Sequence, residues 1–237
     1  MSSETIPSIS TTLAQHLAAS RRASTPRATF WASSLGMCPR KQIAERAGLP
    51  PTRPIDQRSQ FKMWTGEILG HAIQKTLEEA QYLDPAWTER RVVYRSVSGK
   101  LDGKTLTEDS ARVVDAGTLF LPTTGAVVEI KTADDDAIKR PWPEHYFWQG
   151  YFYCLATRLD MLVLFQFGKN QGLARQGIFF LDDEWIQKLE EHITALDAAW
   201  TRYSKSGVLP DHAHRHRWED RVCPYLEQPV KENANGV

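Results

Sequence analysis

The sequence has few cysteines, no long apolar run and no net charge, and each shortage excludes a class of protein. Three cysteines among 237 residues are too few for a disulfide framework, so a reducing, cytoplasmic compartment is expected. No apolar run reaches the length of about 18 residues that a membrane span needs. The first residues also lack the charged start and apolar core of a signal peptide. We therefore expect neither a membrane segment nor a signal peptide.

Charge is balanced over the whole chain but unevenly distributed along it. The 29 basic and 29 acidic residues cancel, so the composition lacks the overall basic charge of many nucleic-acid-binding proteins. Residues 1–62 contain nine Lys/Arg and three Asp/Glu, a net charge of +6 that leaves −6 for the remainder. A basic flank beside an acidic centre suits DNA binding next to a metal site, although a solvated basic tail gives the same pattern.

Length and apolar content fit one domain with elaborations. We expect this domain at residues 31–206, between a basic, partly flexible segment at 1–30 and a polar, histidine-rich tail at 207–237. Hydrophobic periodicity predicts helices at 39–47, 64–82, 143–158 and 183–203, and strands at 91–97, 111–121, 125–132, 161–168 and 175–181. This order predicts an α/β fold in which helices flank a mixed central sheet.

The helix predicted at 64–82 has two different sides. Its apolar residues are expected to face the core, and its polar residues the opposite side. The apolar set is Leu69, Ala72, Ile73, Leu77 and Ala80, and the polar set is Glu67, His71, Gln74 and Glu78.

Two charged residues, Glu129 and Lys131, interrupt an apolar run at 126–132. The β-branched residues of this run predict a central strand. Side chains alternate across a strand, so Glu129 and Lys131 point to the same face, roughly 7 Å apart along it. Buried charges are costly unless they are paired or used in chemistry. The pair is therefore either a surface pair on an edge strand or the acid and lysine of a metal-dependent phosphodiesterase site.

Further polar residues occur on three other predicted elements. Asp102 follows the strand at 91–97, within the turn predicted at 98–103, where glycines permit a tight bend. Gln149 and Tyr153 are four residues apart in a helix and so share a face. Glu67 and His71 have the same spacing in the helix at 64–82. The chain thus offers polar groups on four separate elements.

Taken in order, these motifs resemble the PD-(D/E)XK nuclease superfamily, in the RecB-like branch of phage recombination exonucleases and CRISPR-associated nucleases. The resemblance rests on the order of these motifs along the chain, because each short motif alone is weak evidence for the family. Residues 33–40 are also similar to the N-terminal Ser-x-Leu-x-x-Cys-Pro-Arg segment of the CRISPR-associated members. The resemblance implies a restriction-endonuclease-like core and spans residues 33 to about 168. The motifs are Gly66…His71, Gly99-Lys-Leu-Asp102, Glu129-Ile-Lys131 and Gln149-Gly-Tyr-Phe-Tyr153.

The resemblance also implies a metal site. Asp102 and Glu129 would be its core ligands, because carboxylate oxygens suit Mg²⁺ and Mn²⁺. The carbonyl of Ile130 and the imidazole of His71 would complete the ligand set. Glu67 is a weaker candidate, for a second metal or a supporting role.

The remaining motif residues would act on DNA. Lys131 would orient the attacking water or stabilise developing charge, and Gln149 and Tyr153 would position the DNA backbone and the lysine. The implied activity is that of a metal-dependent exonuclease acting on DNA ends in recombination, repair or phage DNA processing, within a bacterial or phage-infected cell. A phage recombination protein or a CRISPR-type protein is the implied partner. An endonuclease on the same core and a non-catalytic DNA-binding module remain alternatives.

Two aspartates compete for the role of first acidic ligand. Asp102 precedes Glu129 by 27 residues and Asp115 precedes it by 14. The longer spacing implies an inserted hairpin at about 106–122. Asp102 is preferred because it lies in the Gly-x-x-Asp-Gly context, which Asp115 lacks.

The three cysteines bear on a second metal. Some relatives in the implied family hold an iron–sulfur cluster with one N-terminal and three C-terminal cysteines. This chain has Cys38 and Cys223 in such positions but lacks two others, and four thiolates are the usual requirement. We therefore expect no cluster and place Cys154 in the core. The histidines at 212, 214 and 216 with Cys223 form either a polar tail or a zinc site.

Overall fold

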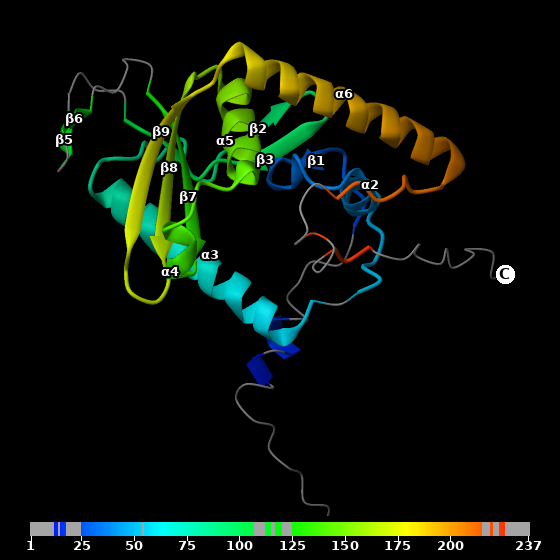
Figure 1. Cartoon of the computed structure of the whole chain (residues 1–237), viewed down its shortest axis with the longest axis horizontal. Coiled ribbons are helices and arrows are strands. Elements are labelled where there is room, and N and C mark those ends of the chain that lie inside the picture. The colour runs from blue at the N-terminus through cyan, green and yellow to red at the C-terminus, as the bar shows by residue number, and fades with distance from the viewer. Residues whose placement is uncertain are drawn as a thin grey trace, which may run out of the picture.

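The computed structural model describes residues 12–13, 15–17, 25–53, 55–106, 112–114, 117–119, 125–214, 219 and 223–225. They form a mixed α/β fold with helices flanking a mixed sheet, which confirms the expected fold class. Figure 1 shows helices α3 (Gln57–Glu79) and α5 (Glu144–Thr157) against the sheet and α6 (Asp183–Ser206) along one side. No helix in the described ranges is long and apolar enough to cross a membrane.

The main sheet has four strands in the order β4-β7-β8-β9. Strands β7 and β8 are parallel, and their crossover connection contains the short helix α4 (Asp135–Ile138) and α5. The other two pairings are antiparallel. The strand bounds are β4 (Gly103–Lys104), β7 (Val127–Ala133), β8 (Met161–Gly168) and β9 (Ala174–Phe180).

A second, three-stranded sheet has the order β1-β3-β2. Its strands are β1 (Phe30–Trp31), β2 (Arg91–Tyr94) and β3 (Val97–Lys100), and a 3₁₀ turn, η1 (Ala32–Ser34), follows β1. Strand β3 pairs antiparallel with β2 and parallel with β1. A separate hairpin pairs β5 (Arg112–Val114) with β6 (Gly117–Leu119).

Two of the strand predictions are wrong. Residues 91–97 are not one strand followed by a turn, because β2 ends at Tyr94 and β3 begins at Val97. The chain reverses at Arg95, whose φ is +52°. No glycine, proline or asparagine marks this turn, so sequence pattern gave no signal for it. The predicted strand at 111–121 is likewise two strands, β5 and β6.

The two faces of β7 pack against different helices. Val128 and Ile130 belong to an apolar cluster that Ile73 and Leu77 of α3 cover. Val127, on the other face, packs in a cluster with α5. Since side chains alternate along a strand, Glu129 and Lys131 point to the same side as Val127, towards α5.

Helix α3 differs from its prediction in two respects. It begins at Gln57 rather than near residue 64, because the side chain of Asp56 caps it by accepting a hydrogen bond from the Ser59 amide. Gln74 is the buried residue of this helix, with 5% exposure, although the apolar stripe placed it on the opposite side. Gln74 is buried because its side chain donates a hydrogen bond to the Asp102 carbonyl, and not because it makes an apolar contact.

The last helix and the segment after it close the core. Helix α6 confirms the helix predicted at 183–203, and its Leu189, Ile193 and Leu196 are at most 1% exposed. After α6 the chain returns beside α2 (Pro39–Arg46), as the orange and red segments of Figure 1 show. Leu209, Cys223 and Tyr225 join the same core cluster as α5 and α6.

Candidate active site

Glu129 and Lys131 form an ion pair on β7 in which the glutamate is buried and the lysine is half-buried. Lys131 Nζ lies 2.5 Å from Glu129 Oε1, and Glu129 is 1% exposed. The alternative of a surface pair on an edge strand is therefore wrong. The second carboxylate oxygen, Glu129 Oε2, is buried and has no hydrogen-bond partner in the part of the chain that the structure describes. Such an oxygen is costly to bury unless a cation or donor occupies the space beside it.

Asp102 joins this pair from a separate segment, between β3 and β4. Its Oδ2 accepts a hydrogen bond from the backbone N–H of Ile130 at 2.7 Å. The N–H and C=O of one residue point to the same edge of a strand, so the Ile130 carbonyl faces the Asp102 side as well. The two carboxylates and this carbonyl therefore gather at one edge of β7.

The electrostatics of the group follow from its burial. Burial raises the pKa of Asp102 well above its usual value, and the charge of Glu129 raises it further. Burial also raises the pKa of Glu129, and Lys131 only partly opposes this shift. Two carboxylates that are disfavoured as anions form a site whose charge a divalent cation would neutralise.

Lys131 stays charged because acids surround it. Burial alone would lower its pKa, but Glu129 and then Asp102 outweigh that effect, so the net shift is upward. Its ammonium donates to Gln149 Oε1 at 2.7 Å, and Gln149 Nε2 donates to the hydroxyl of Tyr153 at 3.3 Å. The ring of Tyr146 lies beside the same ammonium, with its centre 5.3 Å from Nζ. Helix α5 thus holds the lysine in one position.

Because Gly99 has no side chain, Tyr153 of α5 can pack directly against β3. A Cβ atom on Gly99 would lie 2.6 Å from the Tyr153 hydroxyl oxygen and 2.7 Å from the Cβ of Ala32. Tyr153 is 2% exposed and has no room to move aside. The glycine of Gly-x-x-Asp therefore serves the approach of α5 to β3, and not a turn.

We expect Gly99→Ala to lower the free energy of unfolding by about 1–3 kcal/mol, because the added methyl group overpacks the contact with Tyr153. Urea unfolding of the purified protein measures this change. Gly70→Ala in α3 is the matched control, since its Cβ meets nothing within 4 Å. That variant should gain up to about 1 kcal/mol from helix propensity. Equal stability of the Gly99→Ala variant and the parent would contradict the packing argument.

Two residues of the site were not identified from the sequence. Gln74 Nε2 donates to the backbone carbonyl of Asp102 at 2.6 Å and lies 3.5 Å from Glu89 Oε1. Glu89 also accepts a hydrogen bond from Lys100 at 2.9 Å. Burial raises the pKa of Glu89, but Lys100, Gln74 and His71 together reverse the shift, so the net change is downward. Neither residue lies in a recognisable motif, and no pattern in the sequence pointed to them.

The remaining predicted residues lie elsewhere on α3 or outside the described residues. His71 is exposed on α3, one turn before Gln74, and its charge reaches Glu89. Glu67 is exposed and lines a different hollow, with His16 and Trp64. Asp115, the rival of Asp102, lies outside the described residues.

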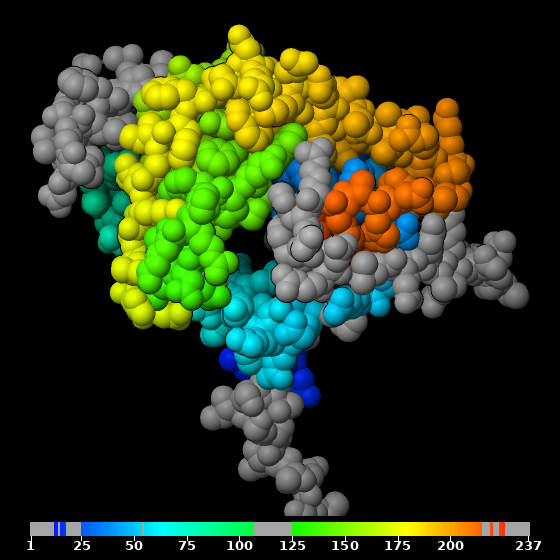
Figure 2. All heavy atoms as spheres, viewed as in Figure 1, coloured from blue at the N-terminus to red at the C-terminus, as the bar shows by residue number. Residues whose placement is uncertain are grey.

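A cavity of about 720 Å³ adjoins the end of β7. Figure 2 shows this face hollowed between the cyan residues of α3 and the green residues that follow β7. Gly66 of α3 approaches Thr132, the residue after Lys131, so closely that an added Cβ would lie 2.8 Å from Thr132 Oγ1. The lining residues are Asp56, Gln57, Arg58, Phe61, Lys62, Thr65, Asp134, Lys169 and Asn170.

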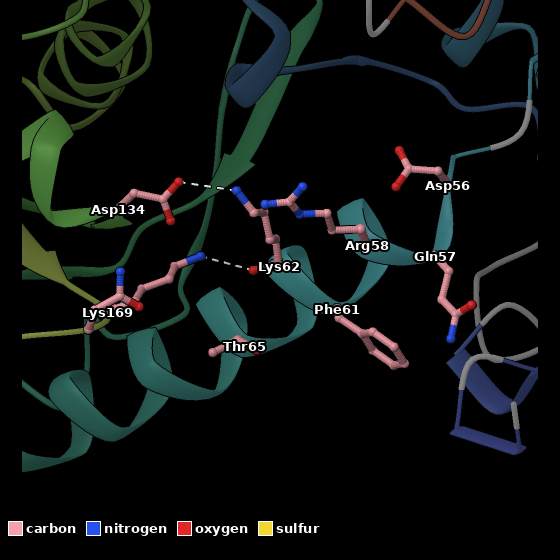
Figure 3. Close-up of a pocket in the computed structure, with 9 residues that line it drawn as sticks. Asp56, Gln57, Arg58, Phe61, Lys62, Thr65, Asp134 and Lys169 are labelled. Atoms are coloured by element: carbon pink, nitrogen blue, oxygen red, sulfur yellow. Dashed lines mark hydrogen bonds and ion pairs between the residues drawn. The ribbon is translucent and has the colours of Figure 1, made fainter. Parts of the chain in front are cut away.

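The cavity combines three cations with two carboxylates. Lys62 Nζ lies 3.1 Å from Asp134 Oδ2, and Lys169 Nζ donates to the Lys62 carbonyl at 2.9 Å (Figure 3). Arg58 extends from the same helix as Lys62. Asp135, next to Asp134, begins α4 and is 6% exposed.

Comparison with known proteins finds similar solved structures but no matching family model or curated sequence. The solved structure of SSO0001 matches with a TM-score of 0.52 and 16% identity, over 94% of this chain and 98% of that one. The alkaline exonuclease LHK-Exo from Laribacter hongkongensis matches with a TM-score of 0.50 and 15% identity, over 81% and 97%. Its complex with dAMP matches over 78% and 96%, with the same score and identity. The chain therefore has a fold that an alkaline exonuclease also uses.

Proposed function

We propose that this protein is a Mg²⁺- or Mn²⁺-dependent deoxyribonuclease of the PD-(D/E)XK superfamily, in its RecB-like branch, and that it degrades DNA from ends. One observation carries the proposal. Asp102, Glu129 and Lys131 come from two separate segments and meet around the buried Glu129, whose carboxylate oxygen Oε2 lacks a hydrogen-bond partner among the described residues. The exonuclease fold of a structural neighbour supports it.

The residues fit a divalent cation. Asp102 and Glu129 would hold it, with the Ile130 carbonyl beside them and His71 as an imidazole ligand reached from α3. Hard oxygen donors of this kind select Mg²⁺ or Mn²⁺ over softer metals. When bound, the ion would supply positive charge at the scissile phosphate and a more acidic water.

The protein's own residues have separate tasks. Lys131 keeps a positive charge beside the carboxylates, so its ammonium would stabilise negative charge on the phosphate or hold the attacking water. Gln149 and Tyr153 fix the position of that ammonium through the two hydrogen bonds from α5. Gln74 holds the backbone of Asp102 in place.

The cationic cavity gives the DNA strand a path to this group. Arg58, Lys62 and Lys169 line it next to the end of β7. Charged side chains of this type bind phosphates without regard to sequence. We propose that they hold the strand on one side of the scissile bond.

The proposed setting is the cytoplasm of a bacterium or phage-infected cell, during recombination, repair or phage DNA processing. We propose that residues 31–206 form the nuclease domain and that a recombination protein or CRISPR-type protein is its partner. These proposals rest on the resemblance of the motifs.

A comparison of DNA topologies tests the activity. With Mg²⁺ or Mn²⁺, we expect linear duplex DNA to be degraded to small products and a covalently closed circle of the same sequence to stay intact. The reaction should stop when both ions are withheld. Gel analysis of end-labelled substrates measures the loss.

Other outcomes favour the alternatives. Nicking or linearisation of the closed circle would indicate an endonuclease on the same core. Binding of linear DNA without any cleavage, in either metal, would indicate a non-catalytic module and would refute the proposed function.

A further inference from the structure

A second group of metal-binding side chains lies away from the proposed nuclease site. Cys38, His212 and His214 each offer one ligand atom, and these atoms lie within 4.8 Å of one another. Cys38 Sγ is 3.9 Å from His212 Nδ1, and His212 Nδ1 is 3.2 Å from His214 Nε2. Cys38 is buried, whereas the two imidazoles lie nearer the surface. The group joins residues more than 170 positions apart in the sequence.

These spacings approach those around one tetrahedral ion. With Zn–S near 2.3 Å and Zn–N near 2.0–2.1 Å, tetrahedral angles place sulfur and nitrogen ligands roughly 3.6 Å apart and two nitrogens roughly 3.3 Å apart. The distance between His212 and His214 is close to the second value, and the distance between Cys38 and His212 is longer than the first. The three atoms would therefore move closer together to share a zinc ion.

Cys38 lies where the C-terminal segment meets the start of α2. It is the N-cap residue of that helix. Its backbone N–H donates to Glu219 Oε2 at 3.0 Å. This contact brings the C-terminal segment to the same point.

Cys223 is a candidate for the fourth ligand, although its thiol lies outside the group of atoms that are within 4.8 Å of one another. Its backbone N–H donates to the Glu219 carbonyl at 2.7 Å, which places it one turn beyond the residue that contacts Cys38. It is 3% exposed and lies within electrostatic reach of Cys38. Two thiolates and two imidazoles make a standard structural zinc set.

We propose that Cys38, His212 and His214 bind a structural zinc ion that fixes the C-terminal segment to the start of α2, and that the thiol of Cys223 turns towards the ion as the fourth ligand. The site is independent of the proposed nuclease activity, because none of its residues contacts Asp102, Glu129 or Lys131 among the contacts of the described residues. Zinc is preferred because its soft thiolate and imidazole ligands differ from the oxygen ligands of the nuclease site.

An iron–sulfur cluster does not suit these residues. A four-cysteine cluster requires four thiolates, and the chain has three cysteines. The third, Cys154, lies in α5, where its thiol donates to the Met161 carbonyl, as expected for a core residue. A two-iron cluster with two histidines places its cysteines and histidines on different irons. The close approach of Cys38 to His212 fits one shared ion instead.

Elemental analysis of the purified full-length protein tests the site. After desalting into buffer without added metal, we expect about one zinc ion per chain and no iron. His212→Ala and His214→Ala should each reduce the zinc content to about a tenth or less. Both histidines lie near the surface, so these variants should stay folded, as circular dichroism will check.

Two controls separate this site from other zinc-binding groups. Cys154→Ala removes a thiol outside the group, and Glu129→Gln disables the nuclease site, so both should retain full zinc. A Co²⁺-substituted protein should show the visible bands of tetrahedral thiolate coordination, and His214→Ala should lose them.

The proposal fails on any of three results: absence of zinc from the parent protein, full zinc in both histidine variants, or stoichiometric iron with visible absorbance. Zinc lost only in Glu129→Gln would place the ion in the nuclease site and would also overturn the proposal. None of these results depends on DNA cleavage, so failure here is distinct from failure of the proposed function.

Discussion

Replacing Lys131 with methionine is expected to lower the rate of DNA cleavage by about a hundred- to a thousandfold while the protein stays folded. Methionine fills much of the volume of the lysine stem but removes the ammonium that Glu129 and Gln149 hold in place. Glu129→Gln should reduce cleavage at least as much, because it removes a charged ligand from the proposed metal site. Single-turnover cleavage of linear DNA at saturating Mg²⁺ measures both effects.

The chain contains a matched pair for control. Glu184 and Lys188 form an exposed ion pair on α6, with 75% and 45% of their side chains accessible. Lys188→Met and Glu184→Gln make the same chemical changes outside the site and should cleave DNA like the parent. An equal loss of cleavage in the α6 variants and the β7 variants would contradict the roles assigned to Glu129 and Lys131. Parental activity in Lys131→Met would also contradict them.

Replacing Asp102 with asparagine is expected to stabilise the metal-free protein. The change removes a buried charge that Glu129 repels, and an asparagine carbonyl can still accept the hydrogen bond from Ile130. In buffer without Mg²⁺ or Mn²⁺, the free energy of unfolding should rise by about 1 kcal/mol or more. The parent should gain about 2–3 kcal/mol from Mn²⁺ at about 100 times its Kd, and the variant should gain far less.

The pH dependence of this difference has a definite sign. Below the ordinary value of 3.8, the Asp102 carboxyl is protonated in both the folded and the unfolded chain, so its burial is not penalised. As pH rises, the unfolded chain ionises first, and the folded parent loses stability until pH passes the raised pKa. The advantage of Asp102→Asn should therefore grow from about pH 4 towards neutral pH.

Thermal and urea unfolding of both proteins measure these changes. Asp136→Asn, an exposed aspartate on α4, is the control and should alter neither stability nor the response to Mn²⁺. A destabilised Asp102→Asn protein that still gains stability from Mn²⁺ would show that another residue, such as Asp115, holds the ion.

The proximity of Glu129 and Lys131 was predictable because strand geometry is regular. An apolar β-branched run determines which side chains share a face, so the proximity of Glu129 and Lys131 followed from alternation alone. The proximity of Gln149 and Tyr153 in α5 was predictable in the same way, because residues at i and i+4 share a helix face. The order of the motifs then identified Asp102, which the structure places against Ile130.

Other parts were not predictable because they depend on tertiary contacts. Gln74 is polar on an apolar-striped helix, and only its hydrogen bond to the Asp102 carbonyl explains its burial. The turn at Arg95 has no sequence signal, so β2 and this turn were predicted as one strand and most of β3 was predicted as a turn. The contacts of Glu219 and Tyr225 with the start of α2 join segments that lie far apart in the sequence, so no local pattern predicts them.

The return of the chain's last segment to its beginning has a consequence for biosynthesis. The amides of Thr52 and Arg53 donate to the Pro224 carbonyl, and Arg40 donates to the carbonyl of Tyr225, 185 residues later. A growing polypeptide makes α2 long before these partners leave the ribosome. That side of the core therefore stays open until residues 224 and 225 have been synthesised, because contacts between such distant residues form late. A chain that stops after α6 contains every proposed catalytic residue but lacks the segment that closes its core.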